Sequence, residues 1–135
     1  MGCMQTVIRS SSNGALCLLL AGHAMAGGES FRGEYQGTGR QCYGKLSVLQ
    51  KTITWDTPFA ACKKRPYTLI KEESGESGRE AVLLLRGKSC GFGVISLRLD
   101  PRHPEYWNAT GYRSKQDYEK NSDEKLLCSV EKLPR

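Results

Sequence analysis

The spacing of the cysteines constrains what this chain can fold into more than any other feature of its sequence. The chain of 135 residues contains six: Cys3, Cys17, Cys42, Cys62, Cys90 and Cys128. The last four are separated by 20, 28 and 38 residues, whereas structural zinc sites usually contain cysteine pairs only about two to four residues apart. The spacing therefore favours disulfides over a metal site, and neither a metal nor a cofactor is predicted.

Residues 1–26 have the pattern of a secretory signal peptide. A short apolar run over residues 15–20 is followed by Ala24-Met25-Ala26, the small-x-small pattern that signal peptidase accepts. Cleavage after Ala26 removes Cys3 and Cys17 and leaves residues 27–135. The alternative is a poorly ordered amphipathic N-terminus on a cytosolic protein. No other segment approaches the roughly 20 apolar residues of a membrane-spanning helix, so no membrane span is predicted.

Export places the four remaining cysteines in the periplasm or the extracellular space, where disulfides persist. Residues 27–135 are enough for one small domain, and cross-links supplement the small core of such a domain. We therefore expect a single exported domain, residues 27–135, that is stapled by two disulfides. Four cysteines allow three different pairings, so the strand pattern has to decide between them.

A β-hairpin is predicted between Cys42 and Cys62. Two short alternating runs flank a turn at residues 50–51, and they place Leu46, Val48, Ile53 and Trp55 on one buried face. Trp55 is therefore predicted to belong to the core. Cys42 and Cys62 both fall near the open end of this hairpin, so Cys42–Cys62 and Cys90–Cys128 are the predicted bridges.

The rest of the chain consists of short apolar or alternating runs separated by turn signals. Strands are expected within residues 31–39, 65–72, 80–87, 90–100, 106–112 and 127–130. Residues 72–78 are predicted to form a polar loop, residues 100–105 a proline-rich turn, and residues 114–125 either a helical turn capped by Ser114 or a loop. The fold class is all-β: a small antiparallel barrel or sandwich of about six to eight short strands.

Catalytic signals are weak. His103 is the single histidine of residues 27–135, which excludes mechanisms that need two histidines. Asp100 and several serines leave a Ser-His-Asp triad possible by composition, but the Gly-x-Ser-x-Gly nucleophile motif is absent. Four glutamates cluster around residues 72–80 without evidence of two facing carboxylates. A non-catalytic protein is therefore favoured over a secreted hydrolase.

Binding has more support from the composition. The net charge is +6 for the whole chain and +5 for residues 27–135, because the signal segment holds one basic residue and no acidic one. Basic surfaces favour anionic partners, and aromatic rings stack on sugars or bases beside cations. The candidate ligand-binding residues are Lys63, Lys64, Arg65, Trp107, Tyr112 and Arg113. The expected partner is an anionic glycan, a lipid or another protein, and export disfavours nucleic acid.

Gly33-Glu34-Tyr35 is similar to the Gly-x-Trp motif in the opening strand of lipocalin-like barrels, with tyrosine in place of the tryptophan. This likeness covers three residues, and no second lipocalin motif is present. It implies an alternative function, in which the barrel encloses a small apolar ligand and carries it.

Overall fold

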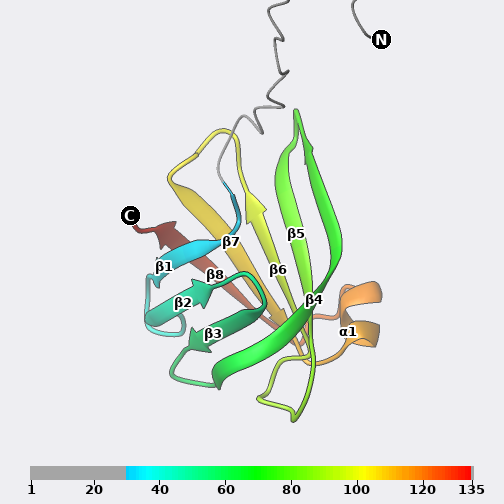
Figure 1. The fold of residues 1–135 in the computed structure, drawn as a ribbon. Coiled ribbons are helices and arrows are strands. Elements are labelled where there is room, and N and C mark those ends of the chain that lie inside the picture. The colour runs from blue at the N-terminus through cyan, green and yellow to red at the C-terminus, as the bar shows by residue number, and fades with distance from the viewer. Residues whose placement is uncertain (1–29, 135) are drawn as a thin grey trace, which may run out of the picture.

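The computed structural model describes residues 30–134, and these form a closed antiparallel barrel of eight strands (Figure 1). Each strand pairs with its neighbours along the chain, and β8 closes the barrel on β1. The elements are β1 (Gly33–Gly37), β2 (Gly44–Val48), β3 (Thr52–Asp56), β4 (Ala61–Gly75), β5 (Gly78–Leu85), β6 (Val94–Leu99), β7 (Tyr106–Tyr112), α1 (Lys115–Glu119) and β8 (Lys125–Lys132). The all-β prediction is confirmed, and the fold is a barrel. The predicted signal segment lies outside the described residues.

The β2–β3 hairpin forms as its alternation predicts. Leu46 pairs with Trp55 and Val48 with Ile53, and all four side chains are buried inside the barrel. The amide of Leu49 donates to the carbonyl of Thr52 across the turn. The hairpin register is therefore fixed by the burial of one face, because a slip of one residue would turn the two inward side chains of the slipped strand out of the core.

Aromatic side chains fill much of the barrel interior. Trp55 stacks on Phe92 with ring centroids 5.1 Å apart, and Tyr35 meets Trp107 edge to face at 5.9 Å. These four residues belong to one continuous buried cluster. An eight-stranded barrel is just wide enough for side chains to fill it or for one small ligand, and here these four aromatic side chains occupy part of the interior.

Strand β4 is longer than the short strands that were expected, and two irregularities bend it (Figure 1). In the first, Lys63 and Lys64 together oppose Thr54, and Lys64 has a φ of +46°. This two-against-one count defines a β-bulge. Cys62 pairs with Trp55 and Arg65 pairs with Ile53, so both lie in inward-facing rows of the ladder. They can do so although they are three residues apart because the bulge adds one residue between them.

Helix α1 packs on the outside of the barrel. Three residues of β5, β6 and β7 form a small outer cluster: Val82, Val94 and Tyr112. The Tyr118 ring of the helix meets the Tyr112 ring edge to face at 5.3 Å. The Ser114 hydroxyl accepts a hydrogen bond from the amide of Asp117. Of the two alternatives for this segment, the helical turn with Ser114 as its N-cap is therefore the one that forms.

The four cysteines form two disulfides, as expected, but the predicted pairing was wrong. The bridges are Cys42–Cys128, with Cα atoms 5.5 Å apart, and Cys62–Cys90, with Cα atoms 5.1 Å apart. Cys42 precedes β2 and Cys62 lies in β4, so β3 separates them in the barrel. Cys42 instead reaches β8 across the closure of the barrel, and the β5–β6 loop folds back to bring Cys90 to β4.

The polar segment over residues 72–78 was predicted to be a loop and is instead the tip of a β-hairpin. β4 continues to Gly75, β5 starts at Gly78, and only two residues form the turn. Figure 1 shows this hairpin projecting beyond the rest of the barrel. Residues at its tip are largely exposed on both faces, so its sequence lacks the apolar alternation that marks a strand with one buried side.

Candidate functional site

Three of the predicted ligand-binding residues lie together at the β-bulge of β4. Lys63 and Lys64 are exposed, and Arg65 is half-buried. The amide of Lys64 donates to the Thr54 hydroxyl at 3.0 Å, which holds the bulge against β3. None of the three takes part in an ion pair with another described residue. The bulge therefore presents two cations to solvent at a fixed place on the barrel wall.

The other three predicted residues lie elsewhere, on or just after β7. Trp107 is inside the barrel and only 1% exposed, because it falls in the inward row opposite Val130. Tyr112 is buried on the outer face beneath α1, and this burial raises its pKa above the ordinary value. Arg113 pairs with Glu124 at 2.8 Å. The structure therefore does not bring the six residues into one surface.

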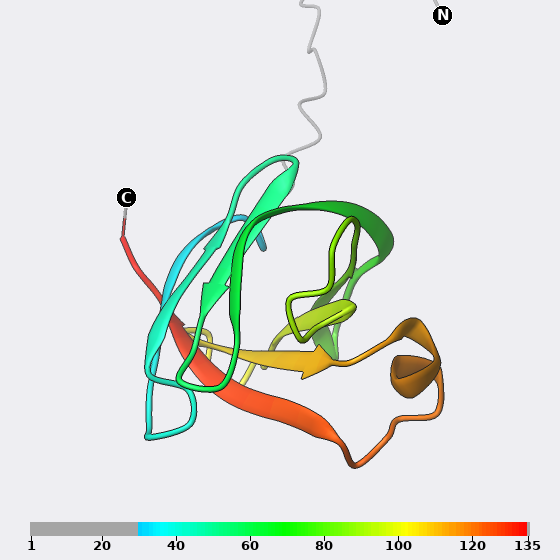
Figure 2. The same ribbon diagram turned by 90° about the horizontal axis from the view of Figure 1, so that it is seen from below.

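Three loops lie at the end of the barrel where β4 starts: the β3–β4 turn and the β5–β6 loop at the bottom of Figure 1, and the β1–β2 loop at its left side (Figure 2 shows the barrel from below). Gly44, next to the β1–β2 loop, packs so closely on β3 that an added Cβ would lie 1.9 Å from the Asp56 carbonyl oxygen. A Cβ on Gly91 would lie 3.3 Å from that of Ala60, so the β5–β6 loop contacts the β3–β4 turn. The Cys62–Cys90 bridge joins the same two segments.

This end of the barrel is strongly basic. Residues 38–45, 56–65 and 86–93, hereafter the basic end, contain one acidic residue, Asp56, and seven basic ones: Arg40, Lys45, Lys63, Lys64, Arg65, Arg86 and Lys88. The hairpin at residues 71–80 contains four acidic and two basic residues, and the α1 connection at residues 113–125 contains four of each. The excess positive charge of the chain is therefore concentrated at one end.

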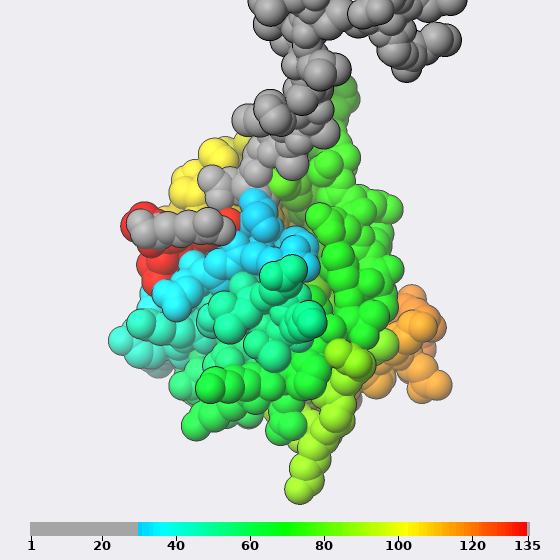
Figure 3. Space-filling model, viewed as in Figure 1, coloured from blue at the N-terminus to red at the C-terminus, as the bar shows by residue number. Residues whose placement is uncertain are grey.

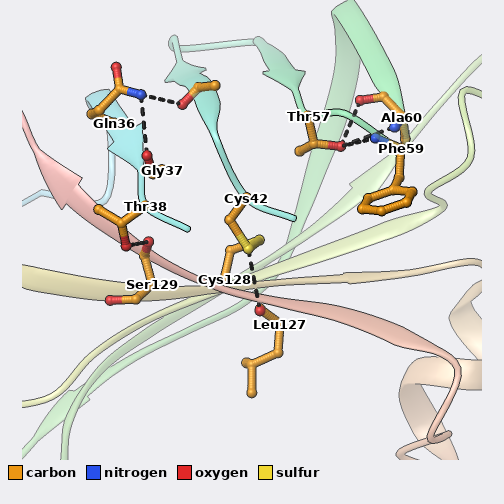
Figure 4. The surroundings of a disulfide bond; sticks show 11 residues. Gln36, Gly37, Thr38, Cys42, Thr57, Phe59, Ala60, Leu127, Cys128 and Ser129 are labelled. Carbon is orange, nitrogen blue, oxygen red and sulfur yellow. Dashed lines mark hydrogen bonds between the residues drawn. A yellow bond between two sulfur atoms is a disulfide. The ribbon is translucent and has the colours of Figure 1, made fainter. Parts of the chain in front are cut away.

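Two aromatic side chains at the basic end are exposed, and the sequence analysis did not single them out. Tyr43 is 72% exposed and Phe59 is 71% exposed. The Thr57 hydroxyl accepts hydrogen bonds from the amides of Phe59 and Ala60 and donates one to the Ala60 carbonyl (Figure 4). The Thr57 amide donates to the same carbonyl. Phe59 is therefore held in solvent by an ordered turn. Its place after Pro58, outside any alternating run, is the signal that could have identified it.

His103 lies beside an open cavity of about 360 Å³ that it shares with Asp100, Tyr106, Asn108 and Ser129. Asp100 is engaged by Arg102: its Oδ1 accepts hydrogen bonds from the amide and Nε, and its Oδ2 accepts one from Nη2. These bonds hold the pKa of Asp100 below its ordinary value. Within residues 30–134, no hydrogen bond joins the His103 ring to Asp100, so the orientation that a catalytic triad requires is not formed.

The glutamates around residues 72–80 form ion pairs along the projecting hairpin. Glu73 lies opposite Glu80 in the ladder, and the ammonium of Lys71 lies 3.7 Å from Glu73 and 3.6 Å from Glu80. The two carboxylates, Glu80 more strongly, raise the pKa of Lys71. Among the residues that the structure describes, no three His, Cys, Asp or Glu side chains gather to hold a metal ion.

Comparisons with protein-family models, with curated proteins and with solved structures find no match to this chain. In the part of the chain that the structure describes, no helix has the length and apolar character needed to cross a membrane.

Proposed function

We propose that this protein is a non-catalytic exported domain that binds an anionic component of the cell envelope through its basic end. One observation carries the proposal: seven cations lie there beside a single acid, six of them exposed and Arg65 half-buried, and none of the seven joins an ion pair with a described residue. The ion pairs found in the described chain lie at Lys71, Arg102, Arg113 and the α1 helix instead. Export is supported by the signal pattern and by the two disulfides.

Uncompensated charge at one end affects how the molecule meets a partner. A cluster of like charges creates a local positive potential that attracts anions and orients the approaching protein. The acidic hairpin at residues 71–80 projects from the opposite end (Figure 1), so the charge distribution favours approach with the basic end first. β2, β3 and the beginning of β4 form the exposed lower front of the molecule in Figure 3, where a large partner has access.

The test is charge reversal at the bulge. Each lysine near an anionic surface contributes about 1 kcal/mol, so K63E/K64E should weaken binding by roughly 30-fold or more. Retention on immobilised dextran sulfate, eluted with a salt gradient, measures the effect. The matched control is K115E/K120E, which changes the net charge equally within the balanced α1 connection. Equal elution of the two variants would remove the basic end as the binding site.

A lipocalin-like carrier is the second candidate. The up-and-down topology with eight strands is that of lipocalins, and the indole N–H groups of Trp55 and Trp107 are buried inside without a hydrogen-bond partner among the described residues. A ligand with an acceptor group would pair with them. Native mass spectrometry tests this function: a carrier retains a small molecule that denaturation releases, whereas an empty native protein argues against it.

A further inference from the structure

The anionic partner can be specified further on the basis of the proposed function. We infer that the basic end docks on an anionic phospholipid bilayer, with Phe59 and Tyr43 in the headgroup region and the surrounding lysines and arginines on the lipid phosphates. Two observations point to this partner: exposed aromatic rings near the loop tips, and uncompensated cations around them.

The first observation is the position of the aromatic rings. Phe59 lies at the β3–β4 turn, and Tyr43 immediately precedes Gly44, whose backbone packs against the Asp56 carbonyl of the neighbouring strand. The two rings therefore come from adjacent connections at the same end of the barrel. Each is more than two-thirds exposed, and exposed aromatic residues that are held in place are typical of interaction sites.

The second observation is the arrangement of cations around these rings. Lys63 and Lys64 follow Phe59 on β4, and Arg86 and Lys88 lie in the loop that the Cys62–Cys90 bridge ties to β4. This loop projects furthest at the basic end (Figures 1 and 3). An aromatic tip surrounded by basic residues matches a membrane interface, which accepts amphipathic rings at the headgroup level and attracts lysines to anionic lipids.

A polysaccharide fits the geometry less well. Aromatic rings that bind sugars usually line a groove with polar groups beside them. Three cavities in the described part of the chain are lined by other segments: the acidic hairpin, the surroundings of His103, and the ends of β1, β2 and β8 at the opposite end of the barrel. Phe59 and Tyr43 project from turns instead. Projecting rings insert into the headgroup region of a membrane more readily than they enclose a polysaccharide chain.

The experiment is co-sedimentation of the purified protein with vesicles of phosphatidylglycerol and phosphatidylcholine, compared with vesicles of phosphatidylcholine alone. Binding to the anionic vesicles is expected to fall about tenfold in F59S and in Y43S, because partial burial of each ring is lost. L49S is the matched control, since Leu49 is also exposed but lies at the opposite end of the barrel. Unfolding midpoints equal to that of the unmodified protein show that the variants are folded.

A tryptophan in place of Phe59 reports insertion directly. Trp55 and Trp107 are at most 1% exposed, so their emission should stay constant, and a blue shift in F59W on anionic vesicles comes from residue 59. An unshifted F59W, or vesicle binding that F59S leaves unchanged, overturns the inference. Retention on dextran sulfate that still depends on Lys63 and Lys64 then leaves the proposed function standing. If neither vesicles nor dextran sulfate bind, both proposals fail.

Discussion

The pairing of the four cysteines makes a sharp prediction about which double mutants stay folded. Removal of one native bridge, by C42S/C128S or by C62S/C90S, leaves the other bridge intact. C42S/C62S takes one cysteine from each bridge and therefore removes both. We expect the first two variants to fold and C42S/C62S to be the least stable of the three.

The magnitudes follow from the sequence separations, which are 86 residues for Cys42–Cys128 and 28 for Cys62–Cys90. Loop-closure entropy gives about 3.6 kcal/mol for the shorter loop. The shorter loop is nested inside the longer one, so the outer bridge closes an effective loop of roughly 58 residues and contributes about 4 kcal/mol. Loss of both costs about 8 kcal/mol, which is comparable to the whole stability of a domain of this size, about 5–15 kcal/mol.

Urea unfolding followed by tryptophan fluorescence measures these free energies, and thiol labelling identifies the partners independently. In the single variant Cys42→Ser, the newly labelled cysteine should be Cys128. Two results together would refute the connectivity: labelling of Cys62 in that variant, and a C42S/C62S protein as stable as C42S/C128S. They would also refute the finding that the β1–β2 loop is linked to β8 across the closure of the barrel.

Three further substitutions, two of them with a matched control substitution, test local features of the fold, all by urea unfolding. Lys64→Gly should raise the free energy of unfolding by up to about 1 kcal/mol, because glycine relieves the left-handed backbone, whereas Lys63→Gly beside it should lower it by about 0.5–1 kcal/mol. Gly44→Ala should cost about 2–3 kcal/mol through its clash with the Asp56 carbonyl, while Gly75→Ala, which has open space, should stay within about 0.5 kcal/mol. Ser114→Ala should cost about 1 kcal/mol by removing the N-cap of α1.

The features that the sequence predicted correctly are those with one buried face. Leu46 and Trp55 alternate with polar residues because the inner face of β2 and β3 is buried and the outer face is exposed to solvent. This contrast is visible in the residue types alone. The same contrast predicted β7, where Trp107 proves to be a core residue. The N-cap at Ser114 is likewise a local signal, since the capping hydrogen bond spans only three residues.

The features that failed depend on information that is not local. The disulfide partners follow from the closure of the barrel, which places β8 next to β1 and leaves β3 between Cys42 and Cys62. The candidate site was incomplete for a different reason. An aromatic residue is usually a core residue, so Tyr43 resembles a core position in the sequence and only its solvent exposure distinguishes it, whereas Phe59 carried one weak signal, its place after Pro58 outside any alternating run.

The basic end is also the end to which the Cys62–Cys90 bridge ties the β5–β6 loop, and this has a consequence for binding. The bridge holds Arg86 and Lys88 against β4, near the Thr57 turn that presents Phe59. A partner that meets this surface has little loop backbone left to order, and loop ordering is one of the costs that binding has to offset. C62S/C90S should therefore bind dextran sulfate and anionic vesicles several-fold more weakly than C42S/C128S, although both keep every cation. If the two variants bind equally well at a temperature where both are folded, the β5–β6 loop is not part of the binding surface.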